Sequence, residues 1–101
     1  MAKIRWSKDS ISDLKEICRF IASDSPYYAA LLRDRIFEMA EHLEVFPEMG
    51  RRVPESDDTS VRELIYKSYR IIYRISEDYL EIIAIVHSSR LLRLMNSNSE
   101  N

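Results

Sequence analysis

The chain has 101 residues, of which 46% are hydrophobic and 32% charged, and its formal net charge is −2. This apolar content excludes a wholly disordered chain, and the single Gly and three Pro exclude collagen-like and Gly/Pro-rich classes. The one cysteine, Cys18, excludes an internal disulfide framework and a cysteine-based zinc site. The length fits one domain, which we place at residues 1–95, followed by a polar tail over residues 96–101.

The charge balance bears on the class of partner. Proteins that bind nucleic acid mainly through its phosphates usually carry a basic excess. Residues 1–50 hold 7 basic and 9 acidic side chains, and residues 51–101 hold 8 of each, so neither half supplies that excess. No apolar run approaches the roughly 18 residues of a membrane span, and the N-terminus lacks the apolar core of a signal peptide. We therefore expect a cytoplasmic protein that does not enter a membrane.

The first half of the chain predicts a strand followed by a helical hairpin. Residues 2–6 alternate between polar and apolar side chains, which indicates a short strand. Ser7 offers an N-cap for a helix whose apolar residues recur every three or four positions and which ends near Ala22. Pro26 suits the first turn of a second helix, and Pro47 ends it.

The second half predicts a loop and a meander of strands. Residues 47–60 form the one long loop, and polar–apolar alternation then predicts strands at residues 61–66, 69–75 and 79–87. The last strand is apolar on both faces, as a central strand should be. The order β-α-α-β-β-β predicts an α+β fold in which the helical hairpin packs on a small, mainly antiparallel sheet.

Short motifs follow one another in a fixed order along nearly the whole chain. They are Trp6-Ser7, Asp13-Leu14, Asp24-Ser25-Pro26, Phe46-Pro47-Glu48-Met49-Gly50-Arg51, Val53-Pro54-Glu55, Val61-Arg62-Glu63-Leu64, Tyr69-Arg70-Ile71-Ile72-Tyr73 and Val86-His87-Ser88-Ser89-Arg90. In order and spacing they resemble the RelE/ParE family of toxins from type II toxin–antitoxin systems. The loop and hairpin motifs resemble the ParE-like branch more than the RelE-like branch.

The resemblance implies a small growth-inhibiting toxin with a role in plasmid stabilisation. It also implies a cognate antitoxin whose C-terminal segment wraps the toxin and which alone contacts operator DNA. The ParE-like branch inhibits DNA gyrase and breaks no bond itself, whereas the RelE-like branch cuts mRNA inside the ribosome. We expect gyrase inhibition, with mRNA cleavage as the alternative and an inactive binding module as a third hypothesis. No cofactor or metal is expected.

The cleavage alternative has specific candidate residues. Cutting RNA with its own 2′-hydroxyl needs an acid, a base and positive charge on the developing phosphorane. By resemblance, Arg70 matches a phosphate-contacting residue of the cutting members, while His87 and Arg90 fall where those members place their terminal acid or base. Glu63 is an alternative base. Against cleavage, the loop offers arginines followed by acids, with no lysine, and an arginine does not easily serve as a base.

The candidates for contact with a target or the antitoxin are Arg51, Arg62, Glu63, Tyr69 and Tyr73. Structural roles compete with these assignments. Arg70 is equally explained by an ion pair with Glu63 or Glu81 on a neighbouring strand, and His87 by a structural hydrogen bond. Tyrosines on a sheet are commonly half-buried with solvated hydroxyls. The residues alone leave both interpretations open.

Overall fold

The computed structural model describes residues 3–88. Its elements are β1 (Lys3–Trp6), α1 (Lys8–Ala22), α2 (Pro26–His42), β2 (Arg51–Arg52), β3 (Val61–Tyr66), β4 (Tyr69–Ile75) and β5 (Tyr79–His87). The expected α+β order is confirmed, with one addition, the short strand β2. Among the earlier expectations, the Arg90 site and the polar tail at residues 96–101 lie outside the described residues.

Two boundaries differ from the prediction. The loop expected over residues 47–60 contains β2, whose two residues are too few to produce a recognisable alternation. The helix α2 ends at His42 rather than at Pro47, because the N–H groups of Leu43, Glu44 and Val45 bond to carbonyls only three residues back. These tighter turns separate the helix from Pro47.

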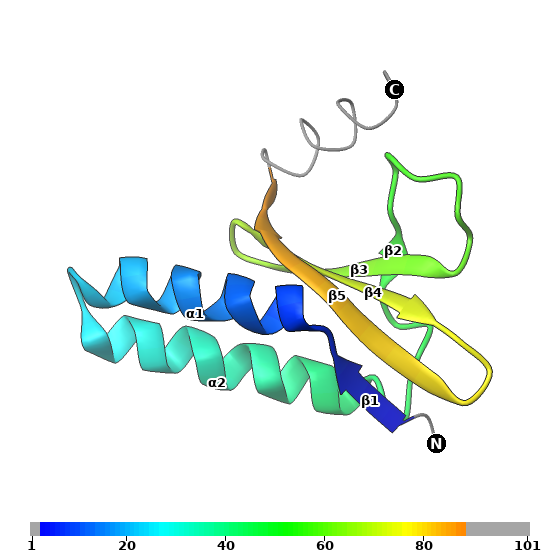
Figure 1. The fold of residues 1–101 in the computed structure, drawn as a ribbon, viewed down its shortest axis with the longest axis horizontal. Coiled ribbons are helices and arrows are strands. Elements are labelled where there is room, and N and C mark those ends of the chain that lie inside the picture. Colours follow the sequence, from blue (N-terminus) through cyan, green and yellow to red (C-terminus); the bar gives the residue numbers. More distant parts are fainter. Residues whose placement is uncertain (1–2, 89–101) are drawn as a thin grey trace.

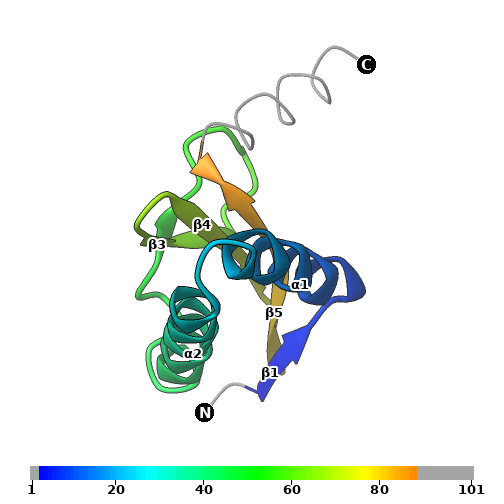
Figure 2. The ribbon, with the colours of Figure 1, turned by 90° about the vertical axis from the view of Figure 1, so that its left-hand side faces the viewer.

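The strands form one sheet in the order β1-β5-β4-β3-β2. The meander and β2 pair antiparallel, whereas β1 pairs parallel to β5. Figure 1 shows α1 and α2 lying side by side on one side of this sheet, and Figure 2 shows the same arrangement from the end of the hairpin. Neither helix within residues 3–88 is long and apolar enough to cross a bilayer.

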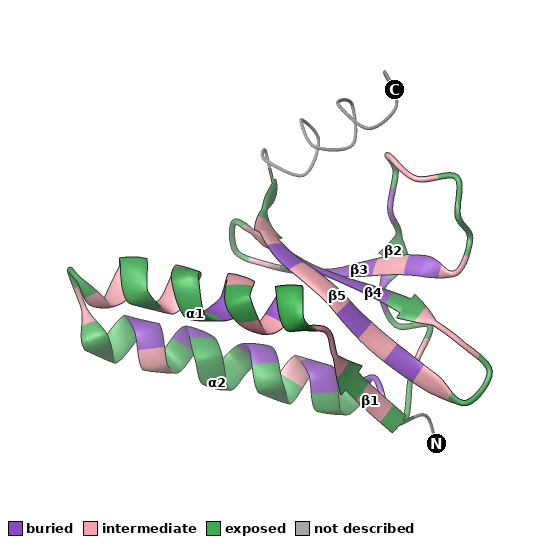
Figure 3. Cartoon of the chain, viewed as in Figure 1, coloured by how far each residue is buried: buried purple, intermediate pink, exposed green. Residues whose placement is uncertain are grey.

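The main core lies between the helical hairpin and the sheet. Its fully buried members include Ile36, Leu43, Ile71, Leu80 and Ile82. Figure 3 shows buried positions along α2 and, between partly buried ones, along β5.

A second, smaller cluster lies on the opposite face of the sheet. There Val53, from the connection between β2 and β3, packs with Val61 and Ile72. Ile83 in β5 is an extra residue, because Ile72 pairs with Ala84 and the next residue, Tyr73, pairs with Ile82. The apolar run in β5 therefore serves both clusters.

Alternation in β4 decides which side chains face the helices. Tyr69, Ile71 and Tyr73 pack on the main core, and Ile72 belongs to the opposite cluster. Arg70 therefore lies on the sheet face that the helices leave uncovered.

Ser7 connects the start of α1 to the sheet. Its hydroxyl accepts a hydrogen bond from the Ser10 N–H at 3.0 Å and donates to the Ile83 carbonyl at 3.1 Å. The carbonyl of Ile82, also in β5, accepts a hydrogen bond from the Ser7 N–H at 3.0 Å. One short side chain thus caps the helix and fixes its first turn against β5.

The two N-caps allow a matched test. Ser25 caps α2 in the same way, through the Tyr28 N–H, but makes no side-chain bond to the sheet within residues 3–88. We expect Ser25→Ala to lower the free energy of unfolding by about 0.5–1 kcal/mol and Ser7→Ala by about 1–2 kcal/mol, because the second bond is lost as well. Urea denaturation measures both, and equal losses would contradict the structural coupling assigned to Ser7.

Candidate functional site

The Arg70 guanidinium lies between two carboxylates. Its Nη1 and Nη2 donate to the two oxygens of Glu55 at 2.8 and 2.7 Å, and its Nε donates to Oε1 of Glu63 at 2.5 Å. The Arg70 side chain is only 5% exposed. This two-point contact with Glu55 is the strongest geometry that an arginine and a carboxylate adopt. The positive charge of Arg70 is therefore neutralised within the protein.

The ion pairs continue to the surface through Glu63. This side chain is fully buried in β3, and its second oxygen accepts a hydrogen bond from the Nε of Arg51 at 2.6 Å. Arg51 lies in β2, directly opposite Glu63, and is itself exposed. Positive and negative groups alternate along the series Arg51, Glu63, Arg70 and Glu55, so the buried charges cancel.

Glu55 and Arg70 each hold the other in its charged form. The hydrogen bond from Arg70 is the main reason that the pKa of Glu55 lies below its usual value. Reciprocally, the bond to Glu55 is the main cause of a raised pKa at Arg70. Arg70 is thus a permanently charged but paired residue, and proton transfer is not open to it.

Tyr73 holds the segment that precedes β2. Its buried hydroxyl donates to the Pro47 carbonyl at 2.7 Å and accepts the Gly50 N–H at 2.9 Å. Nη1 of Arg62 donates to the Gly50 carbonyl at 2.8 Å. Burial raises the pKa of Tyr73, so the hydroxyl keeps its proton for the bond to Pro47. In this structure Arg62 and Tyr73 position a backbone segment.

Gly50 is required by this close approach. A Cβ atom on residue 50 would lie 2.6 Å from the Glu63 carbonyl oxygen and 2.6 Å from the Tyr73 hydroxyl. Neither neighbour can retreat without breaking a sheet or loop contact. The sequence signal for this constraint is that Gly50 is the only glycine in the chain.

The remaining candidates lie at one end of the sheet. Tyr69 and His87 are direct partners across β4 and β5, with ring centroids 5.9 Å apart in an edge-to-face arrangement. Arg70 is adjacent and also donates to the Ser88 carbonyl at 3.4 Å. Tyr69 and His87 thus share the sheet face towards the helices, whereas the Arg70 side chain lies on the opposite face with Glu63. Arg51, Arg62 and Tyr73 lie around β2 and β3.

A hollow of about 370 Å³ beside His87 has an acidic wall. Its lining includes Tyr69, His87 and, from α1, Asp9, Asp13 and Glu16. Among residues 3–88, no three His, Cys, Asp or Glu side chains are grouped so that they could hold a metal ion.

The one partner that the sequence reasoning left without a role is Glu55, although the motif Val53-Pro54-Glu55 contains it.

Comparison with known proteins identifies the family. The family described as "ParE toxin of type II toxin-antitoxin system, parDE" matches residues 4–92. The chain belongs to the ParE toxin family. It is a toxin of a type II toxin–antitoxin system, and this membership implies an antitoxin partner.

Individual relatives agree with this placement. The protein named Toxin RelE2 of Caulobacter vibrioides is 30% identical over 92 residues, which cover 90% of this chain and 100% of the relative. Among solved structures, the fold is similar to that of the "Chromosomal ParDE TA system from P. aeruginosa", with a TM-score of 0.70, 21% identity, and coverage of 86% of this chain and 96% of that one. The conserved hypothetical protein HP0894 from Helicobacter pylori is also similar, with a TM-score of 0.58, 16% identity, and coverage of 88% and 97%. The expected RelE/ParE resemblance and fold class are confirmed.

Glu55→Gln tests the pairing of Arg70. The folded-state pKa of Glu55 is lowered, so its ionised form stabilises the fold above the unfolded-state pKa of about 4.3, and this contribution disappears as pH falls through the folded-state pKa. At pH 7 we expect Glu55→Gln to cost about 1–3 kcal/mol, and we expect the difference from the unsubstituted protein to shrink below about pH 4. Urea unfolding at several pH values measures this. Asp57→Asn, an exposed change in the same connection, is the control, and a cost independent of pH would refute the assignment.

Gly50→Ala tests the steric constraint before β2. We expect it to lower the free energy of unfolding by about 1–3 kcal/mol, because the added methyl group overlaps the Tyr73 hydroxyl and the β3 backbone. Tyr73→Phe removes the hydroxyl and part of the clash. The double variant should therefore be less destabilised than the sum of the two single variants. Additive losses by thermal unfolding would show that Tyr73 is not the group that excludes the methyl.

Proposed function

We propose that this ParE-family toxin inhibits growth by binding DNA gyrase and breaks no bond itself. The observation that carries this proposal is the pairing of Arg70 with Glu55 and Glu63. A residue that stabilises a phosphorane must offer positive charge to the reacting phosphate. At Arg70 that charge is already matched by two carboxylates of the same chain.

The charges around His87 support the same proposal. The hollow next to this ring is lined by Asp9, Asp13 and Glu16, and carboxylates repel an RNA backbone. The whole chain carries a net charge of −2, whereas binding to ribosomal RNA depends on many Lys and Arg contacts to phosphates. Binding to a protein target does not require many Lys and Arg contacts to phosphates.

The proposal gives separate roles to the candidate contact residues. Arg51 is exposed and held in place by Glu63, so it is presented to a partner in a fixed orientation. Tyr69 keeps part of its surface exposed at the other end of the sheet. Glu63, Arg62 and Tyr73 act by positioning the segment that carries Arg51. The toxin would act in the cytoplasm, where gyrase works, without a metal or cofactor, and would reach operator DNA only through its antitoxin.

A supercoiling assay tests the proposal. Purified toxin at micromolar concentration should inhibit supercoiling by gyrase, and Arg51→Gln should raise the concentration for half-inhibition by roughly tenfold, the equivalent of one lost charged hydrogen bond. Arg35→Gln removes the same charge from an exposed site on α2 and should leave inhibition unchanged. Absence of inhibition by a folded toxin that still slows growth would reject gyrase as the target.

One observation favours mRNA cleavage as a second candidate function. Tyr69, Arg70 and His87 lie at the same end of the sheet, and one relative carries the name Toxin RelE2. In this second function, docking on the ribosome would have to withdraw Glu55 from Arg70. New mRNA ends in toxin-expressing cells that disappear with His87→Ala, without any effect on supercoiling, would replace the gyrase proposal by this one.

A further inference from the structure

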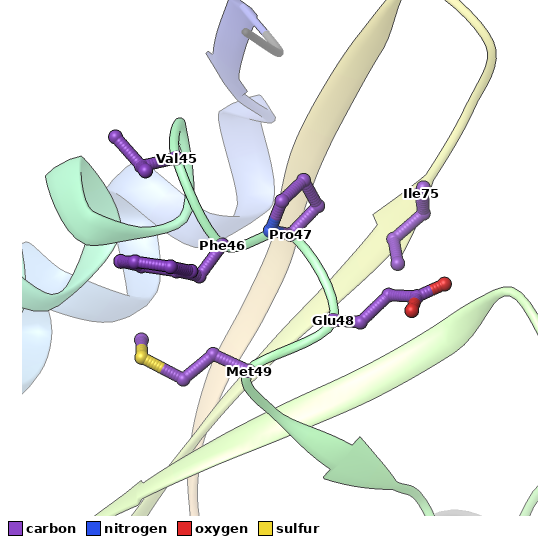
Figure 4. Close-up of a pocket in the computed structure, with 6 residues that line it drawn as sticks. All are labelled: Val45, Phe46, Pro47, Glu48, Met49 and Ile75. Atoms are coloured by element: carbon purple, nitrogen blue, oxygen red, sulfur yellow. The ribbon is translucent and has the colours of Figure 1, made fainter.

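Exposed apolar side chains gather at the sheet end opposite His87. Phe46 is 62% exposed and Met49 is 46% exposed, and Val45 is exposed beside them. Together with Pro47, Glu48 and Ile75 they line a hollow of about 640 Å³, which we call the 45–49 surface. Figure 4 shows the Phe46 and Met49 side chains extending to the same side of the segment, with Glu48 extending to the other. Apolar surface gathered in this way is typical of a docking site.

The backbone below this surface is fixed. The Phe46 N–H bonds to the His42 carbonyl at 3.0 Å, and the Met49 N–H bonds to the Phe46 carbonyl at 3.0 Å. The segment is then held at Pro47 and Gly50 by the Tyr73 hydroxyl. Phe46 and Met49 are therefore exposed on an ordered segment, and a partner would lose little free energy in ordering it.

A second hollow continues the surface and adds acidic side chains. It has a volume of about 460 Å³ and shares Val45, Pro47 and Ile75 with the first. Its remaining lining residues are Glu44, Ser76, Glu77 and Asp78. A third hollow, beside Trp6 and Phe37, adds Glu41 on the side of α2.

The rim of the 45–49 surface therefore has one sign of charge. Residues 38–49 include four Glu and no Lys or Arg. Within residues 3–88, none of the rim residues takes part in an ion pair, and they are Glu41, Glu44, Glu48, Glu77 and Asp78. The nearest arginine along β4, Arg74, is paired with Asp58 at 3.7 Å. The rim offers unmatched negative charge around an apolar centre.

The apolar centre and the acidic rim together indicate which kind of partner binds the 45–49 surface. Nucleic acid and anionic lipid would be repelled by the rim, and a second copy of the chain would place one set of carboxylates against another. A protein segment with large apolar side chains flanked by Lys or Arg would bury Phe46 and Met49 and pair with the rim. The antitoxin is the partner that family membership implies.

We propose that the 45–49 surface binds a basic, apolar segment of the antitoxin, with its apolar side chains on Phe46 and Met49 and its Lys or Arg side chains on Glu48 and Glu77. The assignment rests on the chain's place in a toxin–antitoxin pair and does not depend on which target the toxin inhibits. No residue of the Arg70 series is part of this surface, so the two regions can be altered separately.

The test measures binding of the purified antitoxin encoded beside the toxin gene. Phe46→Ser with Met49→Ser should raise the Kd at least tenfold, since it removes both apolar contacts. Phe20→Ser is the matched control, because Phe20 is 77% exposed and lies on α1, outside the 45–49 surface. The Kd of the Phe20→Ser variant for the antitoxin should stay within twofold of the wild-type value. Thermal unfolding of each variant checks that the fold is intact.

A charge reversal provides an independent measurement. Glu48→Lys with Glu77→Lys should raise the Kd at least tenfold at low salt, with a smaller effect at high salt, because rim charges are screened. Asp24→Lys with Asp57→Lys changes the net charge equally at exposed sites elsewhere and should leave the Kd within twofold.

Three outcomes would overturn the assignment. The first is an antitoxin Kd unchanged in both variant pairs. The second is unchanged antitoxin binding with lost supercoiling inhibition, which would assign the surface to gyrase. The third is a wild-type dimer in solution that Phe46→Ser converts to a monomer, which would assign the surface to a second copy. Because antitoxin binding is measured without gyrase, failure of the gyrase proposal would leave this test intact.

Discussion

The guanidinium of Arg70 is buried, so its charge must be paired with carboxylates of the same protein. This constrains both the strand beside Arg70 and the connection between β2 and β3. Glu63 supplies one carboxylate from β3 and Glu55 the other from the connection. Removing either carboxylate leaves a buried charge only partly compensated, which is among the costlier defects in a protein interior. The connection therefore packs on the sheet face that the helices leave uncovered, where Val53 contributes to the smaller apolar cluster.

One buried hydroxyl, that of Tyr73, links the two regions of interest. By bonding Pro47 and Gly50 it fixes a short segment with Phe46 and Met49 on one side and Arg51 just after it. The exposed apolar side chains and the exposed arginine thus share a single rigid support. Under both proposals the toxin acts through contact between proteins, with an apolar, acid-rimmed surface for its antitoxin and an oriented Arg51 for its target. Arg70, paired with Glu55 and Glu63, joins the connection after β2 to strands β3 and β4.

Much of the fold follows from local patterns. The strands at residues 61–66, 69–75 and 79–87 were predicted at their observed bounds, because alternation is a property of each strand by itself. The parallel pairing of β1 with β5 and the extra residue Ile83 were not predicted, since both depend on a partner strand far away in sequence. The end of α2 was placed too late because Pro47 marks where a helix must stop, whereas three-residue turns replace the α-helical hydrogen bonds from Leu43 onwards.

For the candidate site, the sequence by itself determined the family motifs, the chemical types at Arg70 and His87, and a cross-strand ion pair as one explanation of Arg70. Only the tertiary structure decided that Glu63 rather than Glu81 is the partner, and that Glu55 occupies the rest of the guanidinium. The physical reason is that an ion pair depends on distance in space, and Glu55 reaches Arg70 across an irregular connection whose path no local periodicity describes. The same holds for the 45–49 surface, because a run of residues shows which side chains are apolar, but only packing decides which of them remain exposed.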